Sequence, residues 1–260
     1  MYFYLYDSFL SEGRYEKEIS EIENYLTDIG IAGAIERVSI FKTVKDILKN
    51  AVTKKGATTI VIVGNDNTFR EAIKYIPDFN ISLGFIPLGQ QNHIAKFLGI
   101  PCGAAACDSL SARIIEKIDI GRINDRYFLS SVSIPKTLQT IDCDGKYSIS
   151  LKEVGNVTIC NAPFGEEMRD MQYDYLDPRD GKLDLFIQTA PISIFGKVRW
   201  WFGGQNNALS QSHFITKKIQ LRSENPITIF VDKTKMEDKN FEISLAEEKI
   251  KIIIGKGRMF

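Results

Sequence analysis

The stretch TTIVIVGNDNTFREAIKYI, residues 58–76, contains the transition that decides the fold of this chain. Its apolar, mostly β-branched run at residues 60–63 is typical of a buried strand. The run stops at Gly64, small polar residues follow, and a helical pattern begins at Thr68. The stretch therefore predicts a strand, a tight loop and a helix in succession.

Strand and helix signals alternate on both sides of this unit, up to about residue 118. Strands are expected at 1–6, 34–40, 58–64 and 82–89, and helices at 12–30, 43–56, 68–76, 92–101 and 104–117. This alternation predicts a parallel sheet with covering helices, so we expect an α/β domain over residues 1–118.

The pattern changes after residue 118, where strand-like runs separated by turn residues dominate. These runs lie at 126–134, 146–154, 156–162, 182–190, 217–223, 226–232, 240–246 and 249–255. One helical stretch, 192–211, interrupts them, and core packing is the favoured role of its Trp200 and Trp201, ahead of a place at a membrane interface. We therefore expect a second, β-rich domain over residues 119–260.

Composition excludes several classes of function. The chain has 33 basic and 33 acidic residues, so a bulk electrostatic grip on nucleic acid is not expected. No apolar run approaches the roughly 18–20 residues of a membrane span, and the N-terminus is interpreted as a first strand, not a signal peptide. The two histidines, His93 and His213, are too few for a histidine metal site or a Ser-His-Asp triad. Reduced structural thiols of a cytosolic protein are expected at Cys102, Cys107, Cys143 and Cys160.

The first loop, GNDNT, has the arrangement of a phosphate-binding turn. Such a loop points backbone amides inward, which forces some residues to positive φ. Asparagine tolerates that region best after glycine, so Asn65 and Asn67 are expected to hold it. Asp66 could bind a hydroxyl or a magnesium ion, and Thr68 could cap the helix or donate to a phosphate. An ordinary turn with Asp or Asn caps, in which Asp66 is a helix cap, remains the alternative.

A second loop of the same kind follows the strand at 82–89. Gly89 is followed by a polar cluster at a helix start, where oriented amides favour an anion, and Lys96 lies one turn into that helix. Loops that follow two parallel strands meet at the carboxyl edge of the sheet, where open α/β folds bind ligands. We therefore expect both loops to face one crevice.

At this point the chain resembles the diacylglycerol kinase catalytic-domain family, which includes bacterial lipid kinases and sphingosine kinases and is related to the NAD kinases. The family loop GGDGT and a following Glu are matched at Gly64, Asp66, Thr68 and Glu71. The second motif is matched at Pro87, Gly89, Asn92 and Ala95. Further matches run in family order at IDIGRINDRYF (119–128 from its Asp), DGKLDL (180–185) and NPITIFVDKTK, whose Asp232 stands at the family's catalytic aspartate.

The resemblance implies a nucleotide-binding α/β domain followed by a β-sandwich domain, with the active site between them. It also implies ATP and Mg²⁺ as cofactors and a lipid or small-alcohol hydroxyl as acceptor. The implied roles are catalytic for Asp66 and Asp232, metal-binding for Asp180 and Asp184, and nucleotide-binding for Gly64, Asn65, Asn67, Thr68, Glu71, Gly89, Gln90, Gln91, Asn92 and Lys96. The implied location is the cytoplasm, with at most peripheral contact to a membrane.

The chain departs from the family pattern at residues that bear on chemistry. Two loop glycines are replaced by Asn65 and Asn67, the second motif has Gln90, Gln91 and His93, and the glutamate of the family's DGE is lost. Two interpretations stay open: an ATP-dependent lipid kinase-like phosphotransferase, and a nucleotide- or ligand-binding module without activity. Bland alternatives also stay open: Asp180 in a tight Asp-Gly turn, and Asp232 in a turn after an edge strand. Edge strands of the β-rich half could pair across a homodimer.

Overall fold

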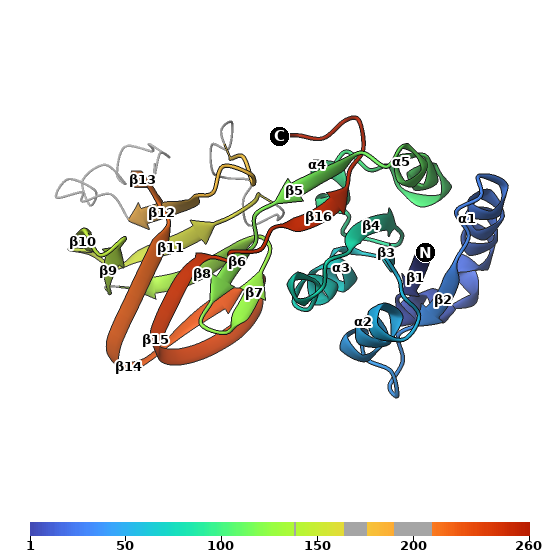
Figure 1. Ribbon diagram of the computed structural model, residues 1–260. Coiled ribbons are helices and arrows are strands. Elements are labelled where there is room, and N and C mark those ends of the chain that lie inside the picture. The colour runs from blue at the N-terminus through green and yellow to red at the C-terminus, as the bar shows by residue number, and fades with distance from the viewer. Residues whose placement is uncertain (138, 164–175, 190–209) are drawn as a thin grey trace, which may run out of the picture.

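The computed structural model describes residues 1–137, 139–163, 176–189 and 210–260. Figure 1 shows two parts side by side, a helix-covered sheet and a strand-rich part, with strands β5 and β16 running between them. The expected helical stretch at 192–211, with Trp200 and Trp201, lies almost entirely outside the described residues. The two parts confirm the predicted fold class of an α/β domain followed by a β-rich domain.

The first sheet has, within the described ranges, the strand order β2-β1-β3-β4-β16-β5. The strands are β1 (Tyr2–Tyr6), β2 (Ala34–Arg37), β3 (Thr59–Gly64), β4 (Ser82–Pro87), β5 (Ile115–Ile118) and β16 (Ile250–Ile253). All neighbours pair in parallel except β5, which is antiparallel to β16. Every residue of β3 and β4 is buried, as expected for central strands covered on both faces.

Helices cover the first sheet in two groups. They are α1 (Glu16–Asp28), α2 (Val44–Thr53), α3 (Asp66–Ile73), α4 (His93–Phe97) and α5 (Ala106–Ala112), with short 3-10 turns at Ser8–Ser11, Gly13–Tyr15, Ile76–Asp78 and Gly103–Ala105. Helix α1 packs against α5, while α3 packs against α2 and α4 (Figure 1). The apolar faces of these helices and the sheet form one continuous core.

The second part is, among the residues that the structure describes, a ten-stranded antiparallel sheet. Its main path runs β13-β12-β11-β8-β14-β15-β6-β7, and β9 and β10 attach to it through β14. The strands are β6 (Gly121–Ile123), β7 (Arg126–Phe128), β8 (Ser131–Thr137), β9 (Thr140–Cys143), β10 (Tyr147–Ser150), β11 (Gly155–Cys160), β12 (Leu183–Thr189), β13 (Ser210–Thr216), β14 (Lys218–Val231) and β15 (Thr234–Leu245). A second core lies within this part.

Some expected elements differ from the observed ones. The runs at 217–223 and 226–232 form one long strand, β14, whose pairing with β15 shifts register between Arg222 and Ile227. The run at 126–134 is two strands, β7 and β8. The last run, 249–255, was expected in the second domain. This prediction is wrong, because the run forms β16, which pairs with β4 and β5 of the first sheet. Its continuous Ile-rich sequence suits burial between two strands.

Two expectations from composition can be compared with the structure. No disulfide bond joins the four cysteines, and Cys102 alone among them is exposed. Within the parts of the chain that are described, no helix is long and apolar enough to cross a membrane.

Candidate active site

The first loop connects β3 to α3. Its Asn65 caps α3 through its side chain, and its Asn67 lies within that helix. The Asn65 side chain accepts hydrogen bonds from the backbone amides of Asn67, at 2.9 Å, and Thr68, at 3.4 Å. Asn65 has an extended backbone with φ −114°, and Asn67 lies within α3. The expectation that both hold positive φ is therefore wrong, because the capping bonds favour an extended N-cap residue.

Asp66 joins the two loops to each other. Its side chain is fully buried and accepts the backbone amides of His93, at 2.8 Å, and Ile94, at 3.1 Å, at the start of α4. Its own amide donates to the carbonyl of Gln91 at 3.0 Å. Burial raises the pKa of Asp66, and the charge of Arg70 and the two amides partly offset the shift. Asp66 is thus a cap, as one sequence interpretation allowed, but it caps α4 rather than its own helix.

Gly64 and Thr68 pack against a residue that the sequence analysis did not select, Asp7. Thr68 Oγ1 donates to Asp7 Oδ2, and Asp7 Oδ1 accepts from the amide of Phe9. A Cβ at Gly64 would lie 2.8 Å from Thr68 Oγ1 and 3.1 Å from the Cβ of Asp7. The glycine is therefore required by close side-chain packing and not by positive φ. Asp7 directly follows β1, and this position at a strand end was the available signal.

The second loop follows β4 and contains the positive φ values that the first loop lacks. Gly89 has φ 78° and Gln91 has φ 66°. Asn92 donates through Nδ2 to the carbonyl of Gly89 at 3.0 Å, which closes the turn. Gln90 and Gln91 are exposed at the carboxyl edge of the sheet. The structure thus brings the two loops together at this edge, as the sequence analysis expected.

Two predicted nucleotide-binding residues lie away from these loops. Lys96 is exposed and lines a separate hollow between α5 and the residues after β16. Glu71 points along α3, where it pairs with Lys74 at 2.5 Å and accepts from the Tyr75 hydroxyl at 3.2 Å. The structure therefore does not bring Lys96 and Glu71 to the capped loop amides, and their predicted roles stay predictions.

Asp232 lies in the tight turn between β14 and β15. It and Lys233 both have positive φ, 45° and 74°, which is typical of a two-residue hairpin turn of type I′. The carboxylate accepts three backbone amides from the segment after β7: Leu129 at 2.7 Å, Ser130 at 2.8 Å and Ser131 at 3.2 Å. The turn interpretation and a functional interpretation of Asp232 are therefore compatible, because the turn fixes the carboxylate in place.

Arg70, a buried residue of α3, links the two parts electrostatically. Burial raises the pKa of Asp232, whereas its amide partners and the charge of Arg70 lower it. The same guanidinium lowers the pKa of Asp66. Arg70 therefore lies within electrostatic reach of one carboxylate from each part of the molecule. It was missed from the sequence because nothing in a helical pattern marks an arginine as buried.

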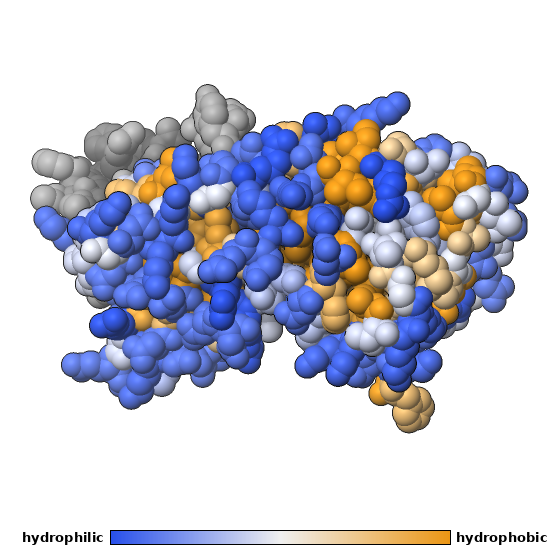
Figure 2. Space-filling model, viewed as in Figure 1, coloured by the Kyte–Doolittle hydropathy of each residue, from blue (hydrophilic) through white to orange (hydrophobic). Residues whose placement is uncertain are grey.

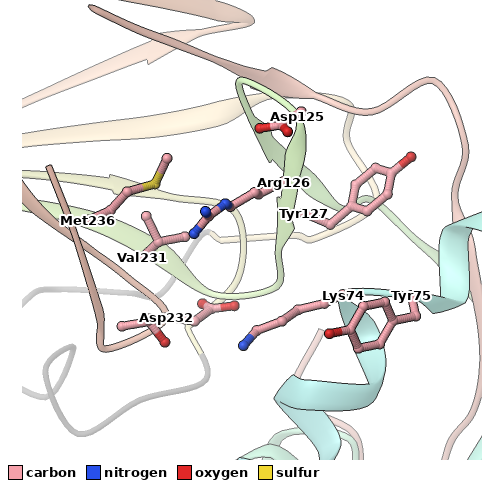
Figure 3. A pocket seen from close by; sticks show the side chains of 9 residues that line it. Lys74, Tyr75, Asp125, Arg126, Tyr127, Val231, Asp232 and Met236 are labelled. Atoms are coloured by element: carbon pink, nitrogen blue, oxygen red, sulfur yellow. The ribbon is translucent and has the colours of Figure 1, made fainter. Parts of the chain in front are cut away.

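A pocket of about 320 Å³ opens between α3 and the second part of the molecule. Figure 3 shows Asp232 and Lys74 extending into this space from opposite sides, with Arg126 and Tyr127 on the strand above them. Its lining residues are Lys74, Tyr75, Asp125, Arg126, Tyr127, Val231, Asp232, Thr234 and Met236. The pocket thus combines apolar and aromatic surface with two carboxylates and two cations, which suits a partly apolar ligand with a polar group.

Asp180 and Asp184, the predicted metal ligands, are engaged elsewhere. Asp180 accepts the amide of Lys182 at 2.9 Å in a turn whose Gly181 has φ 72°, as the tight-turn alternative expected. Asp184 lies 2.6 Å from Nε2 of His213. The strand register aligns Asp184 with Cys160, and Cys160 with Ser131, so Asp184 lies two strands from Ser131. Neither aspartate lines the pocket of Asp232.

The carboxylates of the described residues do not form a protein cage for a metal ion. No group of three or more histidine, cysteine, aspartate or glutamate side chains in that part of the chain could hold one. Asp66, Asp184 and Asp232 are each occupied by amides or by an imidazole. The arrangement therefore does not fit a Mg²⁺ ion bound by these side chains alone.

The first part is a parallel sheet covered by helices, with two loops at its carboxyl edge. The second part is an antiparallel sheet, which places a carboxylate at the boundary between the two parts. Diacylglycerol kinases and NAD kinases have this fold. A crystal structure of a diacylglycerol kinase from Bacillus anthracis matches with a TM-score of 0.76 and 18% identity, covering 98% of this chain and 97% of that one. An NAD kinase from Archaeoglobus fulgidus, solved in complex with ATP, matches with a TM-score of 0.62 and 13% identity over 100% and 96% of the two chains.

Sequence comparison then identifies the family. The diacylglycerol kinase catalytic domain matches residues 2–123. A Pseudomonas aeruginosa protein named as a YegS-like lipid kinase is 35% identical, covering 78% of each chain. A Streptococcus pneumoniae protein, also named as a lipid kinase, is 37% identical over 34% of this chain and 32% of its own length. The chain belongs to the diacylglycerol kinase catalytic-domain family, and this membership supports a kinase-type phosphotransferase.

Proposed function

We propose that this chain is an ATP-dependent phosphotransferase that phosphorylates a hydroxyl group of a lipid or a small alcohol. The observation that carries the proposal is Asp232, a carboxylate fixed by three amides in the wall of the pocket between the two parts. Its Oδ1 accepts two of these amides and its Oδ2 accepts one. Since a carboxylate oxygen has two lone pairs, Oδ2 has a position left, beyond these amides, for the proton of an acceptor hydroxyl.

The acceptor would bind in the pocket, where some residues would contact its apolar part and others its reacting hydroxyl and the transferred phosphoryl group. Tyr75, Tyr127 and Met236 offer apolar surface to the body of the acceptor. Lys74 and Arg126 place positive charge where a phosphoryl group would carry negative charge, and such fixed charges lower the barrier of phosphoryl transfer. Asp232 would accept the hydroxyl proton as the acceptor oxygen attacks.

ATP would supply the phosphoryl group from the carboxyl edge of the first sheet, and this part of the site fits in part. Gln90 and Gln91 are exposed there, and positive φ at Gly89 and Gln91 turns the backbone as phosphate loops require. The amides at the start of α3 already donate to Asn65. No step is assigned to Mg²⁺, because the described carboxylates do not form a site for it.

A second function, a non-catalytic binding module on the same fold, is favoured by one observation. Asn65 caps the amides of Asn67 and Thr68, and Asp66 caps those of His93 and Ile94. Amides that are used in this way are not available to phosphate oxygens. Nucleotide binding would then need these side chains to move, whereas a module that binds another ligand in the pocket would not.

The test is transfer of labelled γ-phosphate from ATP to diacylglycerol dispersed in detergent, and to glycerol, with the full chain and its Asp232→Asn variant. We expect label in one acceptor and a rate that falls roughly 10²- to 10⁴-fold in the variant, the usual contribution of a positioned base. Asp238→Asn is the matched control. Asp238 also accepts backbone amides, those of Lys239 and Asn240 in β15, but it lies outside the pocket. Transfer that is equal in all three proteins would exclude Asp232 as the base, and ligand binding without transfer would favour the module.

A further inference from the structure

The turn Ser39–Lys42, between β2 and α2, presents two apolar side chains to solvent. Ile40 is 91% exposed and Phe41 is 89% exposed, more than any other large apolar side chain among the described residues. In Figure 2 a small apolar protrusion projects from the lower right of the molecule, where Figure 1 shows the connection between β2 and α2. Two adjacent apolar side chains that are almost fully exposed are unfavourable in water. We therefore expect Ile40 and Phe41, the tip of this turn, to contact an apolar partner.

The turn is held in place by hydrogen bonds on both sides of the tip. Ser39 and Lys42 exchange backbone hydrogen bonds of 3.0 and 3.2 Å, and the amide of Phe41 lies 3.3 Å from the Ser39 hydroxyl oxygen. Thr43 then caps α2 by accepting the amide of Asp46 at 3.2 Å. The two apolar side chains are therefore displayed by an ordered turn whose backbone groups are satisfied.

Positive charge surrounds the tip. Residues 36–49, ERVSIFKTVKDILK, contain four basic and two acidic residues, and Glu36 lies 3.6 Å from the ammonium group of Lys42. Arg37, Lys42, Lys45 and Lys49 are all exposed. The other acidic residue, Asp46, accepts the Thr43 hydroxyl at 2.6 Å at the start of α2. In a chain with equal numbers of acidic and basic residues, this local excess is complementary to an anionic surface.

The tip is connected to the pocket of Asp232 through one contact. Lys45 of α2 places its ammonium group 5.7 Å from the centre of the Tyr75 ring, and Tyr75 lines the pocket. The tip also follows the carboxyl end of β2, so it projects from the same edge of the first sheet as the two loops. A surface that holds the tip would therefore lie near both the loops and the acceptor pocket.

We propose that the turn Ser39–Lys42 is a membrane-docking element that inserts Ile40 and Phe41 into the interface of an anionic bilayer, with Lys42 and Lys49 binding the headgroups. Apolar side chains that enter the acyl boundary, flanked by basic residues, are the arrangement of interfacial membrane binding. The inference rests on the proposed function in one respect, since it sets the pocket beside a lipid acceptor. It identifies the surface that delivers that acceptor.

The test is co-sedimentation of the full chain with vesicles of phosphatidylcholine alone and of equimolar phosphatidylcholine and phosphatidylglycerol. We expect binding to the anionic vesicles that weakens with salt, and at least a roughly tenfold loss in the Ile40→Ser/Phe41→Ser double variant. Lys49→Glu should weaken binding about fivefold or more, the usual effect of one basic residue near an anionic surface. Val154→Ser is the matched control, since Val154 is an exposed apolar residue, 51% accessible, of the second part.

The outcomes separate this inference from the proposed function. Vesicle binding that is absent, or equal in wild type and the double variant, would overturn the inference whatever the enzyme does. If the wild type is a dimer and the double variant is a monomer, with no change in vesicle binding, the tip contacts a second copy of the chain. That result would also overturn the inference. Tip-dependent binding without any phosphoryl transfer would support the docking element and contradict the proposed function. Transfer to detergent-dispersed acceptor that survives in the double variant, with transfer to vesicle-embedded acceptor lost, would support both.

Discussion

The carboxyl edge of the first sheet and the pocket between the two parts both fix a carboxylate with backbone amides, but the carboxylate of the pocket also lines open space. At the edge, Asn65 and Asp66 bind the amides that begin α3 and α4, so the loops are bonded to each other. In the pocket, Asp232 accepts three amides and Lys74 pairs with Glu71 at 2.5 Å, yet both side chains line open space. Under the proposed function, the acceptor pocket is open in this structure, whereas the loop amides that would bind phosphate first have to be released from internal bonds.

The largest expected effect comes from removing the carboxylate that joins the loops. Asp66→Ala leaves two amides without an acceptor and removes one of the two carboxylates whose pKa Arg70 lowers, and we expect a loss of about 2–5 kcal/mol in the free energy of unfolding. Denaturant titration measures it. Asp238→Ala, at an exposed carboxylate, should stay within roughly 0.5 kcal/mol of wild type. Equal losses in the two variants would mean that the loops do not depend on Asp66, and the comparison would fail.

The second expected effect concerns the packing beneath the first loop. Gly64→Ala places a Cβ 2.8 Å from Thr68 Oγ1 and 3.1 Å from the Cβ of Asp7, so it should cost about 1–3 kcal/mol as these side chains move apart. Gly13→Ala is the control, since its Cβ would meet only Glu16 at 3.9 Å. A thermal melt of Gly64→Ala that matches that of Gly13→Ala would show that the loop has more room than its contacts indicate.

The third effect separates the cap from the phosphate loop. Asn65→Ala should lower the free energy of unfolding by about 1 kcal/mol, and Asn65→Gly by only a few tenths, because glycine is tolerated at an N-cap. Asn65→Gly also frees the amides of Asn67 and Thr68, so calorimetry should show tighter ATP binding than in wild type. Weaker ATP binding in Asn65→Gly would instead indicate that Asn65 itself binds the nucleotide. The loop at the carboxyl edge would then not need to be released before ATP binds.

The smallest effect is a pH dependence that comes from Asp232. Burial raises its pKa in the folded protein, so its contribution to stability is fully present below the unfolded value, about 3.9, and is lost as pH rises through the folded pKa. The difference in unfolding free energy between wild type and Asp232→Asn should therefore fall as pH rises through that window. Arg70→Gln removes a charge that lowers this pKa, so it should extend the window upward. A difference that rises with pH would contradict the burial of Asp232.

The first part of the fold was predictable because its signals are local. The β-branched run of β3 and the apolar spacing of α1, with Ile19, Ile22 and Leu26 buried, follow directly from side-chain periodicity. The loops at the carboxyl edge were predictable for the same reason, since each follows a strong strand signal. The turn at Asp232 and Lys233 was one predicted alternative, but the strand before it, β14, pairs with β8, β9 and β15 and is not the expected edge strand.

What the sequence could not supply depends on contacts between distant residues. Asp66 meets His93 and Ile94 of the second loop, and Asp7 meets Thr68, although no local pattern pairs them. Asparagine has two ways to serve a loop, through positive φ or through a capping side chain, and composition does not distinguish them. The family resemblance implied a metal-binding role for Asp180 and Asp184, but in the structure a turn engages Asp180 and the imidazole of His213 engages Asp184.

The position of β16 has a consequence for how the chain reaches its native state. This strand lies between β4 and β5, yet more than a hundred residues separate Ile118, the last residue of β5, from Ile250. The first sheet is complete only after the whole second part has been traversed, so its closing contacts have a high contact order and form slowly. A chain cut after residue 118 would expose the edge of β4 and leave β5 unpaired, which favours aggregation. The two parts are distinct in space, but because β16 completes the first sheet we expect them to fold as one unit.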